Sequence, residues 1–225
     1  MVAALDGPRR GATTLPAQQL VVLLHGYGAD GNDLIGLSDP WGALLPTAVF
    51  LSPHGPRPCA ASPRGREWFA LRTNTQRTAD DVATDLRAGV GLAADALNAF
   101  LDRELNVVGL DNRQLALVGF SQGAALALHV GLRRPASAIL AYSGALGPLS
   151  EVLPEPKPRV FLAHGERDGV VPPSALRLAV DALTAAGVPT KWHLSPELAH
   201  GIDGHGVTLG GRFLRDSLAK AAPAG

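Results

Sequence analysis

Short apolar runs alternate with longer segments of helical periodicity along almost the entire chain, and this alternation constrains the fold most. The runs are rich in leucine and β-branched residues, as buried strands are. They are LVVLL (20–24), TAVFL (47–51), QLALVGF (114–120), SAILAY (137–142), PRVFLAH (158–164) and TKWHLS (190–195). Helical patterns occupy 80–105, 122–133, 173–187 and 207–220. Strand and helix in alternation predict an α/β fold, with a mostly parallel, doubly wound sheet flanked by helices.

The domain organisation predicted from this pattern is a single unit spanning residues 1–225. No linker, repeat or shift in composition divides the chain. Residues 52–77 depart from the alternation, because they are rich in proline, glycine and arginine, and we expect a long loop there. Trp68, Phe69 and Leu71 lie in this loop. They either line a substrate pocket or pin the loop to the core, and the sequence does not decide between these two roles.

Composition narrows the classes of function. The 225 residues are 46% apolar and 18% charged, which allows a substantial core. Basic and acidic side chains number 20 each, so a nucleic-acid partner or an anionic membrane surface is disfavoured. Cys59 is the only cysteine, which excludes an internal disulfide and a thiolate-rich metal cluster. The N-terminal stretch lacks a secretory signal and no apolar run is long enough to span a bilayer, so we expect a soluble cytoplasmic protein.

The segment GFSQG (119–123) matches the G-x-S-x-G pattern, with Ser121 at its centre. The pattern alone is weak, but here it lies where a predicted strand is followed by a predicted helix, as a nucleophile elbow requires. In such an elbow the turn is sharp, the glycines leave room for it, and the serine hydroxyl projects above the carboxyl edge of the sheet. The alternative is a serine that merely caps the helix N-terminus.

A serine nucleophile needs a histidine base and an orienting carboxylate, which follow it in the order acid, then histidine, in this type of fold. Asp168 lies in the loop after the strand 158–164, and His200 lies in the loop after the strand 190–195. Both loops leave the carboxyl ends of strands, where open α/β sheets bind ligands. Glu166 is the competing acid and His205 the competing base. The remaining candidates are weaker. Asp181 and His129 lie within helices, and His193 lies within a strand, where we expect a packed core residue. His25 and His164 each precede a glycine and are suited to ordering loops.

An oxyanion hole is the third requirement of this chemistry. One donor should be the backbone N–H of Gln122, the residue after the nucleophile. The second should come from the loop after an early strand, where HGYG (25–28) follows LVVLL directly. The N–H of Tyr27 is the predicted donor.

These motifs together resemble the phospholipase/carboxylesterase family of α/β hydrolases, which includes acyl-protein thioesterases. The resemblance covers about residues 18–216. It rests on LLHGYGADGNDLIGL (23–37), GREWFAL (65–71), GFSQGAALAL (119–128), HGERDGVVP (164–172) and LAHGI (198–202). It implies that Ser121, Asp168 and His200 are the catalytic residues and that Tyr27 and Gln122 supply the oxyanion donors. It also implies an α/β-hydrolase fold, no metal or organic cofactor, and homodimers in several members.

The function expected from the sequence is therefore a serine carboxylesterase. It would hydrolyse short- to medium-chain carboxylic esters through an acyl-enzyme intermediate, with a small-molecule ester as its partner. Acyl-protein thioesterase, lysophospholipase, lactonase and peptidase activities stay open. A protein of this fold that binds a ligand without catalysis is the alternative from a different class, because fold alone does not determine function.

Overall fold

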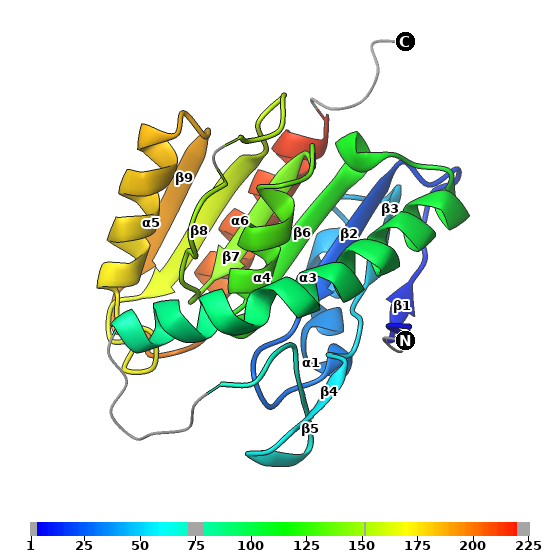
Figure 1. The fold of residues 1–225 in the computed structure, drawn as a ribbon. Coiled ribbons are helices and arrows are strands. Elements are labelled where there is room, and N and C mark those ends of the chain that lie inside the picture. Colours follow the sequence, from blue (N-terminus) through cyan, green and yellow to red (C-terminus); the bar gives the residue numbers. More distant parts are fainter. Residues whose placement is uncertain (1–3, 72–78, 151, 220–225) are drawn as a thin grey trace.

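The computed structural model describes residues 4–71, 79–150 and 152–219 (Figure 1). Its centre is a seven-stranded sheet in the order β1-β3-β2-β6-β7-β8-β9. Strand β1 is antiparallel to β3, and every other neighbouring pair is parallel. The strands are β1 (Arg9–Arg10), β2 (Gln19–Leu24), β3 (Ala48–Leu51), β6 (Leu115–Phe120), β7 (Ala138–Tyr142), β8 (Arg159–Gly165) and β9 (Thr190–Ser195). The mostly parallel sheet predicted from the sequence is confirmed.

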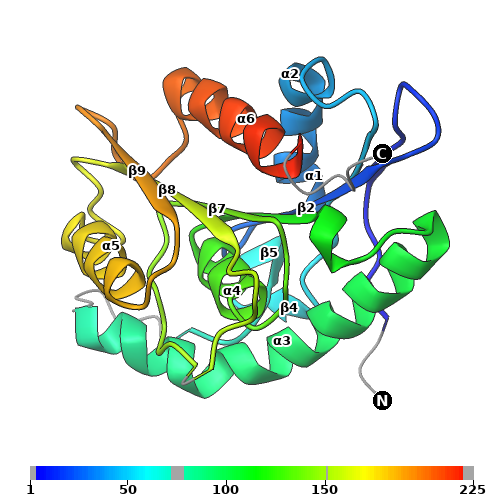
Figure 2. The same ribbon diagram turned by 90° about the horizontal axis from the view of Figure 1, so that it is seen from above.

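Helices cover both faces of this sheet (Figure 2). One face carries α3 (Ala79–Val108), α4 (Gln122–Gly131) and α5 (Ser174–Ala185). The other carries α1 (Gly31–Leu34), α2 (Ser38–Gly42) and α6 (Gly204–Leu218), with short 3₁₀ turns at Ile35–Leu37 and Asn112–Gln114. The four helices predicted from periodicity are present, with ends shifted by a few residues.

Strand β2 shows why the sheet needs helices on both sides. Its side chains alternate between faces with a period of two residues. Leu20, Val22 and Leu24 join the apolar cluster under α3, α4 and α5, whereas Val21 and Leu23 join the cluster under α2 and α6. All five side chains are fully buried. A strand that is apolar on both faces is stable only as an inner strand of a doubly covered sheet.

The segment 52–77 differs from the long loop expected there. Residues Arg57–Cys59 (β4) and Ser62–Glu67 (β5) form a separate antiparallel two-stranded sheet. Proline and glycine obscure the strand signal, because both residues are uncommon in strands, yet an isolated hairpin tolerates them. Residues 72–77 of the expected loop lie outside the described part of the chain.

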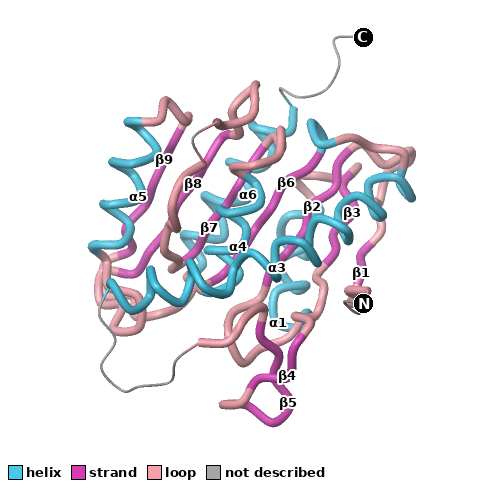
Figure 3. Tube along the Cα trace, in the orientation of Figure 1, coloured by secondary structure: helices cyan, strands magenta, loops and turns pink. Residues whose placement is uncertain are grey.

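The carboxyl ends of the parallel strands meet at one edge of the sheet, and loops gather there (Figure 3). The loops after β2, β6, β8 and β9 all leave this edge. Because the two-stranded sheet also hydrogen-bonds to the loop after β2, through Gly28 N to Arg66 O (3.0 Å) and Arg66 N to Ala29 O (2.7 Å), it lies at the same edge.

Candidate active site

Ser121 occupies a strained turn between β6 and α4. Its φ of 53° and ψ of −114° are rarely adopted by a residue with a side chain, and such strain costs about 1–3 kcal/mol. Two glycines make the turn sterically feasible. A Cβ at Gly119 would overlap the carbonyl of Gly123, and a Cβ at Gly123 would overlap the carbonyl of Leu24. The local sequence GFSQG therefore folds as the elbow predicted for it, with the serine at the N-terminus of α4.

His200 lies between Ser121 and Asp168. Its Nε2 is 3.0 Å from Ser121 Oγ, and its Nδ1 is 2.7 Å from Asp168 Oδ2. An ionised carboxylate only accepts hydrogen bonds, so Nδ1–H donates to Asp168 and Nε2 is left to accept from the serine hydroxyl. The His200 ring also packs against Phe120, with ring centroids 4.8 Å apart. Three side chains remote in the sequence thus form one continuous hydrogen-bonded chain.

The side chain of Asp168 is completely buried, and each of its carboxylate oxygens has a partner. Oδ1 accepts from the backbone N–H groups of Val170 and Val171, each at 2.9 Å. Oδ2 lies near His200 and also 3.2 Å from Nε2 of the buried His164. Burial by itself would raise the pKa of Asp168, but the hydrogen bonds from the two histidines and the two amides outweigh it and hold that pKa well below its usual range.

Two residues at this edge were not selected by the sequence analysis as partners of the site. His164 Nε2 lies 2.9 Å from Val171 O as well as near Asp168, so it orders the loop that carries the carboxylate. Ser143, at a φ of 48° after β7, has its Oγ 3.2 Å from Gly201 O in the loop of His200. The first has a sequence signal in the spacing of four residues between His164 and Asp168, whereas nothing local to Ser143 reveals its contact.

The two predicted oxyanion donors flank the elbow. Gly26 lies so close to it that an added Cβ would be 2.9 Å from the Phe120 ring and 3.6 Å from Ser121 Cβ. Within the described residues, neither the Tyr27 nor the Gln122 N–H donates to a protein acceptor. Gln122 is the first residue of α4, where backbone N–H groups are free and the helix dipole favours negative charge. The neighbouring Cys59 thiol, together with burial, raises the pKa of Tyr27 to about 12.

The segment after β5 is fastened to the elbow by the Gln122 side chain. Trp68 N–H donates to Gln122 Oε1 (2.9 Å), and Gln122 Nε2 donates to Phe69 O (2.6 Å). Trp68 and Phe69 are 1% and 3% exposed, and the half-buried Leu71 packs against the same core cluster. This burial favours the second of the two roles left open above, because these aromatic side chains pin the segment to the core.

The competing candidates lie outside the hydrogen-bonded chain of Ser121, His200 and Asp168. Glu166 is exposed, and its N–H bonds to Ser195 O. Asp181 is exposed on α5. His205 is exposed at the start of α6, and its ring packs against that of His193 at 4.9 Å. His193 is only half-buried, so the expectation that it is a core residue is wrong, because β9 is an edge strand.

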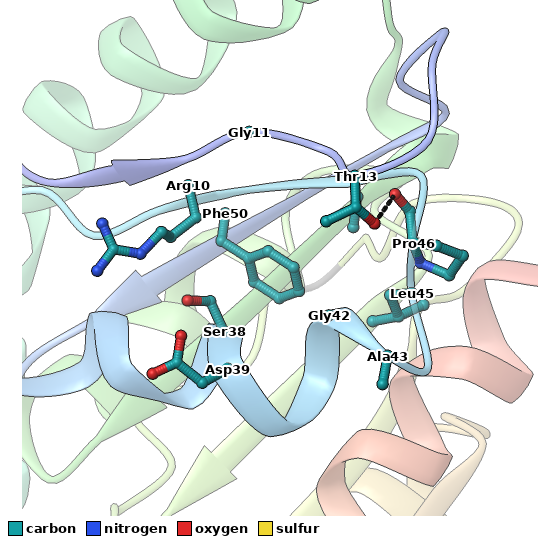
Figure 4. Close-up of a pocket in the computed structure, with 11 residues that line it drawn as sticks. Arg10, Gly11, Thr13, Ser38, Asp39, Gly42, Ala43, Leu45, Pro46 and Phe50 are labelled. Atoms are coloured by element: carbon teal, nitrogen blue, oxygen red, sulfur yellow. Dashed lines mark hydrogen bonds between the residues drawn. The ribbon is translucent and has the colours of Figure 1, made fainter.

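Two hollows elsewhere in the structure are not lined by Ser121, His200 or Asp168. One, of about 350 Å³, lies between β1, β3 and α2, and its polar side chains are those of Arg10, Thr13, Ser38 and Asp39 (Figure 4). The other, of about 390 Å³, lies between α5 and β9. Among the described residues, no group of three His, Cys, Asp or Glu side chains is suited to hold a metal ion.

A model of the phospholipase/carboxylesterase family matches residues 11–218. The chain belongs to this family. The match spans every segment that carries the site, and the resemblance inferred from the sequence motifs is confirmed. Membership identifies the protein as a hydrolase of carboxylic esters with the α/β-hydrolase fold.

Individual family members support this assignment. The chain is similar to esterase YpfH of Escherichia coli K12, at 29% identity over 208 residues, or 91% of this chain and 85% of the relative. It is also similar to acyl-protein thioesterase 1 of Gibberella zeae, at 24% identity over 80% of this chain and 82% of the relative. The crystal structure of esterase PE8 shares 36% identity and a TM-score of 0.86, covering 96% of this chain and all of that one. None of the described helices is long and apolar enough to cross a membrane.

Proposed function

We propose that this family member is a serine carboxylesterase that hydrolyses short- to medium-chain esters through an acyl-enzyme. The observation that carries the proposal is the chain of contacts from Ser121 through His200 to Asp168, at 3.0 and 2.7 Å. Serine is nucleophilic only when a base takes its proton, and a base of this kind must lie within hydrogen-bond reach. The strained elbow adds support, because strain of that type gathers at functional sites.

In the acylation half-reaction, Ser121 Oγ attacks the ester carbonyl carbon while its proton passes to His200 Nε2. The carbonyl π electrons move to oxygen, and the resulting oxyanion accepts hydrogen bonds from the N–H groups of Tyr27 and Gln122. The tetrahedral intermediate then collapses, the carbon–alkoxy bond breaks, and the alcohol leaves with the proton of His200. Asp168 stays ionised and stabilises the imidazolium, since its low pKa keeps it from accepting that proton.

In the deacylation half-reaction, water replaces the alcohol. His200 takes one proton from water, the hydroxide oxygen adds to the acyl carbon, and the Ser121 oxygen leaves with that proton. The products are the free carboxylic acid and the regenerated enzyme. Both half-reactions use the same base and the same two oxyanion donors, so one site suffices.

The proposal extends to the substrate and to the state of the enzyme. Leu71 is only half-buried, so among the three residues proposed to bind substrate it has the most surface left for an acyl chain. Trp68 and Phe69 then contribute to substrate binding by holding the segment 68–71 in place. Resemblance to the family supports a homodimer, and the balance of 20 basic and 20 acidic residues supports a small neutral substrate in the cytoplasm over a nucleic acid. Analytical ultracentrifugation tests the homodimer, and cell fractionation tests the location in the cytoplasm.

Turnover of p-nitrophenyl acetate and butyrate by the Ser121→Ala variant tests the mechanism. Removal of the nucleophile should lower kcat by about 10³-fold or more. Ser174→Ala is the matched control, because Ser174 is exposed at the start of α5. Wild-type turnover by Ser121→Ala would refute the mechanism, as would an equal loss in both variants.

Acyl-protein thioesterase or lysophospholipase activity is the second candidate, favoured by the similarity to acyl-protein thioesterase 1 of Gibberella zeae. The same triad chemistry cleaves thioesters, so the discriminating quantity is kcat/KM. A series of p-nitrophenyl esters from two to sixteen carbons should give its maximum at or below about eight carbons. Higher kcat/KM for palmitoyl thioesters or for lysophosphatidylcholine would favour this second candidate instead.

A further inference from the structure

His25 is a completely buried histidine at the end of β2 to which the reaction above gives no role. Its ring makes two hydrogen bonds. Nδ1 lies 2.8 Å from Gly26 O, and the N–H of Gly55 donates to Nε2 at 2.8 Å. The ring also packs against Trp68 at a centroid distance of 5.1 Å, and Trp68 Nε1 donates to His25 O. Such a fully engaged imidazole has a fixed orientation.

These contacts settle which ring nitrogen of His25 carries hydrogen. The N–H of Gly55 can only donate, so Nε2 is the acceptor. Nδ1 therefore carries the hydrogen and donates it to the carbonyl of Gly26. Burial, the largest influence on this group, lowers the pKa of His25 and favours this neutral form.

The Gly26 carbonyl belongs to the same peptide unit as the N–H of Tyr27. A trans peptide is planar, and its C=O and N–H point in opposite directions, so fixing the oxygen also fixes the direction of the N–H. Residue 26 is a glycine, whose backbone rotates more freely than that of other residues. The orientation of this peptide therefore depends on hydrogen bonds from outside it. Among the residues that the structure describes, the oxygen has one other donor, Ala29 N–H, at the longer distance of 3.3 Å.

We propose that His25 is a positioning residue for ester hydrolysis, which holds the Gly26 carbonyl so that the Tyr27 N–H is aimed at the oxyanion. The inference rests on the proposed function, because it assumes that Tyr27 donates to the tetrahedral intermediate. The donor is needed only when charge develops on the substrate oxygen. A misaimed Tyr27 N–H therefore lowers kcat and leaves KM nearly unchanged.

Two amide substitutions separate the two hydrogen bonds of the ring. The terminal group of asparagine reaches the position of Nδ1, so His25→Asn keeps a donor for Gly26 O and loses the acceptor for Gly55 N–H. Glutamine reaches the position of Nε2, so His25→Gln keeps the acceptor and loses the donor. Each variant loses one buried hydrogen bond, and the pair is therefore balanced in its cost to stability.

Steady-state kinetics on p-nitrophenyl butyrate, with thermal unfolding of each variant, tests the proposal. We expect His25→Asn to keep kcat within about threefold of wild type. His25→Gln should lose about 10- to 100-fold, somewhat less than the loss of a whole oxyanion donor, with KM within about twofold. Equal kcat in the two variants, or kcat that simply follows the unfolding temperature, would overturn the proposal. His129→Asn and His129→Gln, on α4 away from the elbow, are controls expected to keep wild-type kcat.

A measurement on the unaltered enzyme keeps the test decisive even if a variant does not fold. Long-range ¹⁵N–¹H correlation spectra of ¹⁵N-histidine-labelled protein report the tautomer of each ring. The resonances of His25 should show hydrogen on Nδ1 alone, whereas hydrogen on Nε2 would overturn the proposal. If Ser121→Ala retains activity, the proposed function fails. If Ser121→Ala is inactive while His25→Asn and His25→Gln are equally active, only the role of His25 fails.

Discussion

At the scale of single residues, the elbow depends on a position, Gly123, that has no room for a side chain. Gly123 packs so closely on β2 that a methyl group there would overlap the carbonyl oxygens of Leu24 and His25. Both atoms belong to the backbone, and neither can move without disturbing β2 and the loop 25–28 that follows it. The elbow therefore tolerates little beyond glycine at this position.

The Gly123→Ala substitution should lower the free energy of unfolding by about 3 kcal/mol or more, at the upper end of overpacking effects. Urea denaturation measures this change, and ester turnover should fall with it because Ser121 shifts. Gly36→Ala is the control, since a Cβ at Gly36 meets no atom within 4 Å. A stable, fully active Gly123→Ala variant would show that the elbow is less tightly packed than described.

The depressed pKa of Asp168 limits how activity can depend on pH. Its pKa is depressed, so the carboxylate stays charged down to pH values well below those of an ester assay. Protonation of Asp168 should therefore contribute nothing when activity falls on acidification. A plot of log kcat/KM against pH should have a slope of one on its acid side. A slope of two would mean that a second group, such as this carboxylate, also titrates.

At the scale of secondary-structure elements, α4 links the elbow at Ser121 to the segment that follows β5. Its first residue, Gln122, is a proposed oxyanion donor through its backbone N–H and holds Trp68 and Phe69 through its side chain. Further along the same helix, burial and then the charge of Arg133 lower the pKa of His129 to about 4. Two predictions concern this helix.

Replacing Gln122 by methionine keeps the length of the side chain and removes both of its hydrogen bonds. The Trp68 N–H and the Phe69 carbonyl would be left buried without partners, at about 1–3 kcal/mol each, so the free energy of unfolding should fall by about 2–6 kcal/mol. Urea denaturation tests this, with the exposed Gln18→Met as a control expected to change stability by less than about 0.5 kcal/mol. An unchanged Gln122→Met would mean that the segment is held by other contacts.

His129 should make the protein less stable in acid. Because its pKa is about 4 when folded and near 6.5 when unfolded, the unfolded chain binds the proton first. Stability is then complete above about pH 6.5 and declines as the pH falls toward 4. His129→Gln should lose less unfolding free energy between pH 7 and pH 4.5 than wild type. Equal losses in the two proteins would contradict the assignment, and data at pH 8, where His129 is neutral in both states, provide the baseline.

Sequence patterns predicted elements well where burial is strong and poorly where local signals compete. Five of the six apolar runs, β2, β3, β6, β7 and β8, are strands buried on both faces, a constraint that is visible in composition. The sixth, β9, is an edge strand that is buried only in part. The hairpin of β4 and β5 was missed because its residues include proline and glycine. Its place in the fold is set by a tertiary hydrogen bond between Gly28 and Arg66 of β5, which the local sequence does not reveal. Strand β1 is too short to carry any periodicity.

At the scale of the whole molecule, the parallel sheet converts distant sequence segments into one site. Its strands deliver their following loops to a common edge, so residues 25–28, 121, 168 and 200 converge although they span most of the chain. That convergence was predictable from motif order and fold. The contact of Asp168 with His164 and the hydrogen bond between His25 and Gly26 O were not predictable, because they depend on side-chain directions that only a folded structure fixes.

The central claim is that Ser121 is activated by His200, and covalent labelling tests it most directly. A fluorophosphonate should react at one serine, and peptide mass spectrometry should find the adduct on Ser121 alone. His200→Ala should slow labelling by about 10³-fold or more. An adduct on a different serine, or undiminished labelling of the His200→Ala variant, would contradict the account.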